Sequence, residues 1–137
     1  MKWTQGPKML NQRERHACAL FEYFDGTQKV IVTGGLGLKF EFYESTEILD
    51  LNNPTTWVKG PDLPKKKNNH SMVSLNGVAY IICGYDSFEF GPSNSIFRLA
   101  CNQNCHWIKM KQELEIARYS TTATLVPYAL TNCINKT

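Results

Sequence analysis

The sequence predicts an all-β chain built from repeated four-stranded antiparallel sheets. Two observations carry this prediction. Trp3, Trp57 and Trp107 are spaced by 54 and 50 residues, and each opens a similar short pattern. Two short runs rich in β-branched residues, 30–35 and 79–84, each end in glycine. Self-similarity at such a period indicates a repeat architecture in which every repeat is one small structural unit.

The tryptophan pattern extends to a second set of positions. Thirteen residues after the first two tryptophans come His16 and His70, and twelve residues after the third comes Tyr119. Histidines that recur at the repeat period indicate a repeated structural duty, because catalytic residues rarely repeat in this way. We therefore interpret both as structural marks of the repeat and predict no catalytic residue in the chain.

Each repeat begins with a predicted β-hairpin. An Asn-Gly pair at 76–77 and an Asp-Gly pair at 25–26 supply the positive φ angles that tight turns need. The runs 30–35 and 79–84 follow these turns, and they are too short for helices. We predict that both runs are buried strands.

The second half of each repeat predicts two more strands. A loop rich in glycine and aromatic residues comes first, followed by the apolar segments 48–51 and 96–99. A turn then leads to Trp57 in the first repeat and to Trp107 in the second. Each period thus holds four short strands in an antiparallel meander, which is the content of one propeller blade.

These residues resemble the kelch repeat, whose period is about 50 residues. The matching marks are the Gly34-Gly35 pair after a hydrophobic strand, the stretch 43–50 leading to Trp57, and the segment 61–70 with its prolines and Asn-His pair. The second repeat departs from the family pattern, since Cys83-Gly84 replaces the paired glycines. The third repeat departs further, because its corresponding run, 125–133, contains no glycine pair.

The resemblance implies kelch-type β-propeller blades, about two and a half of them in an incomplete ring. The end of a preceding blade covers 1–12, kelch repeats cover 13–62 and 63–112, and a partial, degenerate repeat covers 113–137. Because propellers close with four to eight blades, we expect the chain to be a fragment of a longer kelch protein. Self-association through open blade edges is the other way to cover the exposed apolar surface.

Composition limits the classes of function. A net charge of +3 is mild, and it does not predict the clustered basic face of a nucleic-acid-binding protein. No stretch approaches about 18 consecutive apolar residues, so no membrane span is predicted. We expect a cytoplasmic protein without cofactor or metal.

The five cysteines leave one point open. Cys18, Cys83 and Cys133 lie in or beside apolar strands, where free thiols behave as small hydrophobic residues. Cys101 and Cys105 are free thiols in a turn or a local disulfide, and the sequence does not decide between them. A zinc site needs four ligands at suitable spacing, and the sequence has no second pair of cysteines or histidines that would complete a site with Cys101 and Cys105.

Two surface regions are candidate partner-binding sites. The loops after the glycines both contain Phe-Glu-Phe, at 40–42 and 88–90. Exposed aromatic residues of this kind anchor protein partners. The alternative is that one phenylalanine of each set packs between the blades. The loop residues considered for partner binding are Phe40, Phe42, Tyr85, Phe88 and Phe90.

The second region is the run Lys65, Lys66 and Lys67, which follows Pro64. Three adjacent lysines attract an acidic segment and raise its association rate. The plainer interpretation is a solvated loop that aids solubility.

The resemblance implies a non-catalytic protein-protein interaction module. Related proteins of this type recruit substrates to cullin-type ubiquitin ligases or bind actin, and either role is an expectation by family analogy. The alternative is a fragment of a kelch-propeller enzyme, similar to galactose oxidase or to a sialic acid mutarotase.

Overall fold

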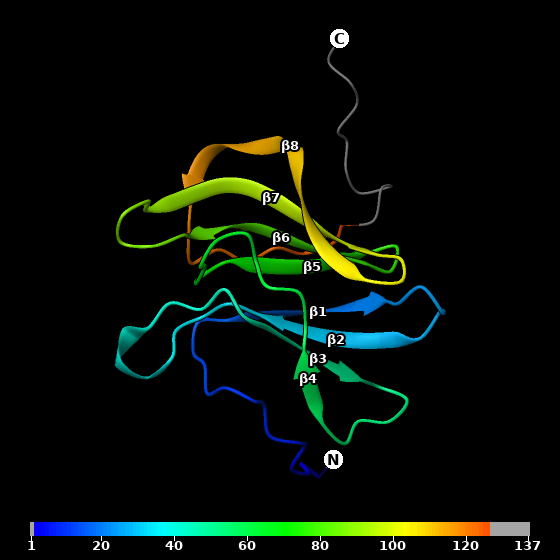
Figure 1. Ribbon diagram of the computed structural model, residues 1–137. Helices are drawn as coiled ribbons and strands as arrows, with labels where there is room; N and C mark the ends of the chain where they lie inside the picture. The colour runs from blue at the N-terminus through cyan, green and yellow to red at the C-terminus, as the bar shows by residue number, and fades with distance from the viewer. Residues whose placement is uncertain (1, 127–137) are drawn as a thin grey trace.

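The computed structural model describes residues 2–126, which form two stacked four-stranded antiparallel sheets (Figure 1). In both sheets, neighbouring strands follow chain order, so each sheet is a simple meander. The prediction of an all-β fold made of four-stranded antiparallel units is confirmed. The only helical element in these residues is one short 3-10 turn, η1 (Leu38–Phe40).

The strands of the two sheets alternate regularly with turns and loops. The first sheet contains β1 (Ala17–Glu22), β2 (Gln28–Thr33), β3 (Thr46–Asp50) and β4 (Trp57–Lys59). The second contains β5 (Ser71–Leu75), β6 (Val78–Tyr85), β7 (Pro92–Cys101) and β8 (Cys105–Arg118). The predicted boundary at residue 112 falls inside β8, because this strand continues as far as Arg118.

The hairpin turns arise from the residues that predicted them. Asn76 and Gly77 both have positive φ, at 50° and 75°, which is the requirement of a two-residue hairpin turn between β5 and β6. In the longer turn between β1 and β2, Gly26 has φ of 79°, and the Asp25 carboxylate accepts a 2.9 Å bond from the Thr27 amide. Local turn chemistry therefore fixes the pairing of the first two strands of each sheet.

The hydrophobic core lies between the two sheets. β1 lies nearest to β5 and β6 of the second sheet, and its side chains alternate between more and less buried positions, as expected when one face of each sheet is buried. The buried members of this core are Phe21, Ile31, Leu63, Ala79, Ile81, Phe97, Leu99 and Trp107. A single apolar layer therefore holds the sheets in a fixed relation.

The tryptophans at the ends of the repeats anchor the chain in a repeated way. The Trp57 indole donates to the Pro7 carbonyl at 3.1 Å, and the Trp107 indole donates to the Pro61 carbonyl at 3.0 Å. Pro7 and Pro61 lie four residues after Trp3 and Trp57, so the same bond recurs between successive repeats. Trp3 is different, because it is 99% exposed.

A row of backbone bonds runs across the repeats beside the first strands. The Asn69 amide donates to the Arg15 carbonyl and the Ser120 amide donates to the Asn69 carbonyl, both at 2.9 Å. All three residues have positive φ, between 50° and 54°. The structure therefore makes Ser120 the equivalent of Arg15 and Asn69, which places Thr121 at the histidine position. The sequence alignment that gave Tyr119 this position was wrong by two residues.

Some predictions concern residues outside the described range. Cys133 and the part of the predicted degenerate repeat beyond residue 126 lie there. Within the described range, no helix is long and apolar enough to cross a membrane.

Candidate binding site

The loops that carry the candidate site are positioned by the glycines after β2 and β6. Gly34, Gly35 and Gly84 have positive φ, at 58°, 95° and 109°. A Cβ on Gly35 would lie 3.0 Å from the His16 Cβ, and one on Gly84 would lie 2.6 Å from the His70 Cβ. Glycine thus provides both the backbone conformation and the space for the histidine of the same repeat.

The two histidines occupy equivalent places but different environments. His70 is buried, with its Nε2 atom 2.7 Å from the Thr33 hydroxyl of the first sheet. Burial, together with the positive charges of Lys67 and His16, lowers the pKa of His70 to about 3. His16 is exposed, and its Nδ1 atom lies 3.1 Å from the Arg13 carbonyl. His70 therefore links the sheets as a neutral side chain.

A buried ion pair lies next to each glycine turn. In the first repeat, Arg13 and Glu47 have fully buried side chains and meet at 2.5 Å. The arginine also donates to the Gly34 and Ser45 carbonyls at 2.7 and 3.0 Å. Glu47 accepts further bonds from the backbone amides of Leu10 and Asn11. This pair ties the segment before β1 to the middle of the first sheet.

Lys67 takes the place of Arg13 in the second repeat, three residues before the histidine. Its side chain is 3% exposed and pairs with Asp86. The expectation of three solvent-exposed lysines is therefore wrong for Lys67, because Asp86 draws its ammonium group inward. Only Lys65 and Lys66 remain exposed in the run.

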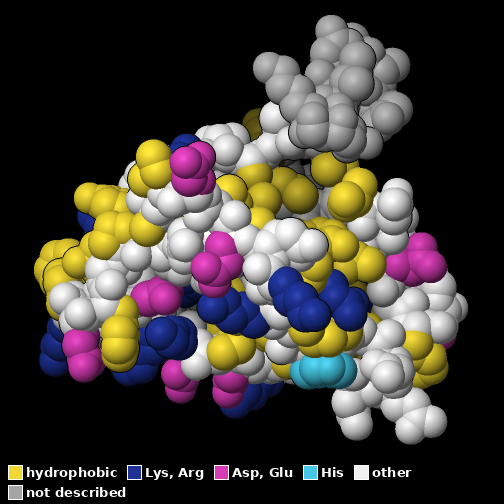
Figure 2. Space-filling view, turned by 90° about the horizontal axis from the view of Figure 1, so that it is seen from above, with side chains coloured by type: hydrophobic (Ala, Val, Ile, Leu, Met, Phe, Trp, Pro, Cys, Tyr) yellow, Lys and Arg dark blue, Asp and Glu magenta, His cyan; other side chains and the backbone are white. Residues whose placement is uncertain are grey.

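The loops after the glycines form an aromatic hollow of about 360 Å³. The Phe42 ring packs edge-on against Phe88, with 5.0 Å between centroids, and the Tyr85 ring packs against Tyr119 at 5.3 Å. Phe88 is 80% exposed and Phe40 is 68% exposed. Figure 2 shows hydrophobic side chains gathered at its left-hand end, where Figure 1 places these two loops. The predicted meeting of equivalent loops thus brings Phe40, Phe42, Tyr85 and Phe88 together.

Phe90 points to a different part of the surface. Its ring lies 4.5 Å from the Lys65 ammonium, which is the distance of a cation–π contact. Both residues line a separate hollow beside Asp86 and β7. The Phe-Glu-Phe motif of the second repeat therefore divides its aromatic side chains between two surfaces.

The aromatic hollow has one charged group and two amides. Arg15, Asn68 and Asn69 line it beside the rings. The Arg15 side chain is half-exposed, and its ion partner, Glu14, lies at 3.6 Å and is more exposed still. A guanidinium group so loosely paired is free to bind an oxygen acceptor on a partner. The hollow therefore offers a large apolar surface and a small number of polar donors.

Sequence reasoning missed four members of this hollow, which are Arg15, Asn68, Asn69 and Tyr119. Arg15 stands beside a repeat histidine and Tyr119 follows β8, so neither lies in a loop after a glycine. The signal in the sequence was the equivalence of Arg15 and Asn69, each of which stands directly before a repeat histidine.

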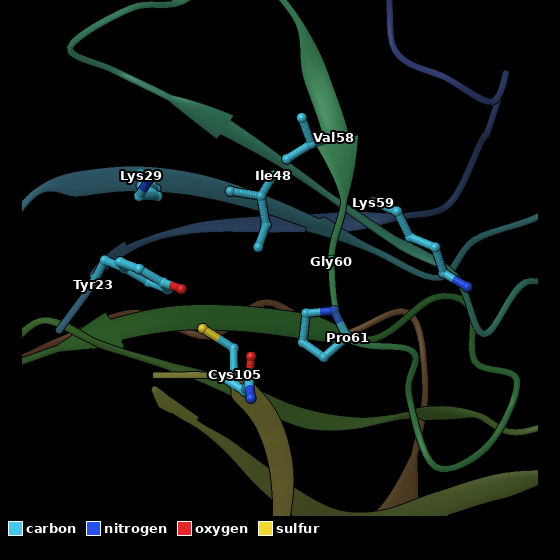
Figure 3. Close-up of a pocket in the computed structure, with 9 residues that line it drawn as sticks. Tyr23, Lys29, Ile48, Val58, Lys59, Gly60, Pro61 and Cys105 are labelled. Carbon is cyan, nitrogen blue, oxygen red and sulfur yellow. The ribbon is translucent and has the colours of Figure 1, made fainter. Parts of the chain in front are cut away.

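A second hollow of about 280 Å³ lies at another point between the sheets (Figure 3). Tyr23 and Ile48 from the first sheet face Pro61 and Cys105 across it. Its lysines are already paired, Lys29 with Asp50 and Lys59 with Asp62, both at 2.9 Å. Cys105 forms a disulfide with Cys101, which answers the point that the sequence left open. The paired charges make this hollow a weaker candidate than the aromatic one.

No group of three or more His, Cys, Asp or Glu side chains suited to a metal ion occurs in residues 2–126. The sequence matches no protein-family model, and no curated protein matches it.

Proposed function

We propose that the chain is a non-catalytic protein-binding module of the kelch type, and that the aromatic hollow holds its partner. One observation carries the proposal. Equivalent loops of the two repeats bring phenylalanines together at the surface, and these phenylalanines are not part of the core between the sheets. Burying a phenylalanine that is now mostly exposed contributes about 2 kcal/mol to binding. Exposed aromatic clusters of this kind mark interaction sites.

The composition of the hollow supports a protein partner over a small substrate. Tyrosine and arginine are residues in which interface binding energy concentrates, and phenylalanine is enriched in the buried centres of interfaces. The hollow also lies on loops held by rigid strands, which is a common placement for binding residues. The partner is a protein segment with an apolar side chain for the rings and an acceptor for Arg15. Recruitment of substrates to a cullin-type ubiquitin ligase and binding to actin are the two roles that the kelch resemblance suggests.

A displayed peptide library selected on the full chain tests this proposal. Phe88→Ala is the first variant, because its side chain is exposed and its removal should change the free energy of unfolding by less than about 0.5 kcal/mol. We expect selected peptides to bind this variant at least tenfold more weakly than the unchanged chain. Phe24→Ala is the matched control, since Phe24 is 59% exposed and lies in the turn after β1. Equal loss of binding in both variants contradicts the assignment of the hollow.

The cellular location belongs to the same proposal. The cytoplasm is the location that the sequence predicts, whereas a disulfide such as Cys101–Cys105 usually persists in oxidising compartments. Counting reactive thiols in the chain isolated from its native source decides between them. Reaction of both cysteines with a thiol reagent without prior reduction supports the cytoplasm, and protection of both supports an oxidising compartment.

A further inference from the structure

Strand β8 is an edge strand with an unusual length. It pairs with β7 on one side, and no other strand in residues 2–126 pairs with its outer edge. Its register against β7 shifts by two residues between Lys109 and Glu113 and by three more between Glu113 and Arg118, so β8 bulges from the ladder but stays paired with β7 at Glu113 and Arg118. Figure 1 shows β8 curving away above β7. A long edge with free backbone groups is a template for pairing with another strand.

The exposed part of β8 has a regular two-residue pattern. The even positions carry Ile108, Met110, Gln112, Leu114 and Ile116, and the odd positions carry Lys109, Lys111, Glu113 and Glu115. Side chains alternate between the faces of a strand, so one face of this segment is charged and the other is largely apolar. Ile116 is 63% exposed, although it belongs to the apolar set.

The order of the charges is complementary to itself when the strand is reversed. If two copies pair antiparallel with Gln112 at the centre, Lys111 of each copy stands opposite Glu113 of the other, and Lys109 stands opposite Glu115. Met110 then meets Leu114, and Ile108 meets Ile116. Opposite charges and apolar side chains placed directly across a ladder both stabilise the pairing. A parallel, in-register pairing would place lysine beside lysine instead.

We propose that two copies of this chain associate through antiparallel pairing of β8 with β8 about Gln112. The contact is a two-fold one, because the same surface patch serves both copies. Within one chain, Lys109 already pairs with Glu113 at 2.7 Å. Lys111 and Glu115 make no ion pair in the described structure and gain partners only in the dimer. The association does not depend on the aromatic hollow or on its partner.

Charge reversal in trans tests the proposal directly. One variant carries Lys109→Glu with Lys111→Glu, and the other carries Glu113→Lys with Glu115→Lys. We expect the unchanged chain to dimerise in sedimentation equilibrium, and each variant alone to dimerise at least tenfold more weakly because like charges face each other. An equimolar mixture of the two should regain the dimer. A monomeric unchanged chain, or a mixture no tighter than its components, overturns the proposal.

The register has its own test. In a background of Cys18→Ser and Cys133→Ser, Gln112→Cys should form a disulfide between copies under mild oxidation, because opposite Cα atoms of an antiparallel pair lie about 4.5–5.5 Å apart. Glu115→Cys is the matched control, since six residues of offset separate its two copies by about 20 Å. Equal cross-linking of the two variants overturns the Gln112-centred register. Circular dichroism of each variant shows that the chain remains folded.

Discussion

The two sheets share one framework, and they differ in the side chains at equivalent positions. Leu49 lies opposite Trp57 in the first sheet, just as Leu99 lies opposite Trp107 in the second. Two residues before these leucines stand Glu47 and Phe97. The first is the acid of a buried ion pair, and the second is a buried ring with the Lys67 ammonium 6.0 Å from its centroid. The same place in the fold therefore accepts a charge or an aromatic ring.

The comparison shows that the preceding segment determines which side chain fits. Arg13 cannot release its proton, so it needs a carboxylate that is equally buried. Lys67 has a longer, more flexible stem and reaches Asp86 in the next loop. Burial lowers the pKa of Lys67, although Asp86 opposes this effect. A buried network around Arg13 and Glu47 therefore stabilises the first sheet, whereas the single Lys67–Asp86 ion pair takes this role in the second.

Removing the carboxylate of each ion pair should give the largest difference in the free energy of unfolding between the two sheets. Glu47→Ala leaves the Arg13 guanidinium buried without its partner and frees the amides of Leu10 and Asn11. We expect a loss of about 4 kcal/mol in the free energy of unfolding. Asp86→Ala should lose about 2 kcal/mol, less than the usual cost of breaking a buried pair, since the lysine moves toward water or releases its proton. Urea unfolding of both variants at pH 7 measures the difference.

Repeating the measurement at pH 9 sharpens the same comparison. Lys67 without Asp86 should lose its proton more readily, so the cost of Asp86→Ala falls as the pH rises. The cost of Glu47→Ala should not change over this range, because arginine stays charged. Equal costs for both variants at both pH values would mean that the two ion pairs are interchangeable.

The glycine turns provide the second contrast. Gly34 has φ of 58°, and a Cβ there would overlap the Lys67 carbonyl oxygen. Cys83 holds the equivalent position with φ of 52°, and its sulfur lies 3.0 Å from the Thr121 hydroxyl. The second turn therefore has room for a side chain where the first has none.

We expect Gly34→Ala to lower the free energy of unfolding by about 3 kcal/mol, through overlap and left-handed strain together. Cys83→Gly should change it by less than about 1 kcal/mol, because relief of strain offsets the lost packing. Gly26→Ala is the control for φ alone, since Gly26 also has positive φ but has open space around it. A Gly34→Ala loss no greater than that of Gly26→Ala rules out the close approach of Lys67 as the cause.

The same contrast shows which features the sequence predicts well. The hairpins, the strand runs and the glycine turns depend on residues within a few positions of each other, so their chemistry is visible locally. Asn76 and Gly77 need no distant partner to adopt positive φ. The meander follows from these local signals because short turns force neighbouring strands to pair.

The burial of charged residues depends on distant partners. Nothing in the run of three lysines distinguishes Lys67 from Lys65 and Lys66, because Asp86 and Phe97 come later in the chain. The usable signal was periodic: Arg13 and Lys67 both stand three residues before a repeat histidine. A cation at the same position in both repeats indicates a structural role, as the recurring histidines do.

The candidate site was predicted in part for the same reason. The matching loops indicated that Phe40, Phe42, Tyr85 and Phe88 would meet. Phe90 lies elsewhere, where its ring contacts the Lys65 ammonium group. Tyr119 was misaligned because the positive-φ residue of the third repeat, Ser120, lies two residues later than an alignment of Tyr119 with His16 and His70 implies. Loop side chains are placed by such pairwise contacts, which repeat spacing does not encode.

The two histidines give the contrast with the smallest expected effect, which is the pH dependence of the free energy of unfolding. The pKa of His70 in the folded chain, about 3, lies below the ordinary value of 6.5. The unfolded chain therefore binds a proton first as the pH falls, and folded stability is lost progressively below pH 6.5. His16 is exposed, and its pKa is lowered mainly by partial burial. It should contribute less to this loss.

Between pH 7 and pH 5, we expect the free energy of unfolding to fall by about 2 kcal/mol. His70→Asn should remove most of this slope, whatever its effect at pH 7, whereas His16→Asn should keep most of it. Thr33→Val provides a further control, because it removes the hydroxyl partner of His70 but leaves the imidazole buried. Urea unfolding at pH 7, 6 and 5 gives the slopes. If His70→Asn and His16→Asn flatten the profile equally, the buried link between the sheets is not the source of the acid sensitivity.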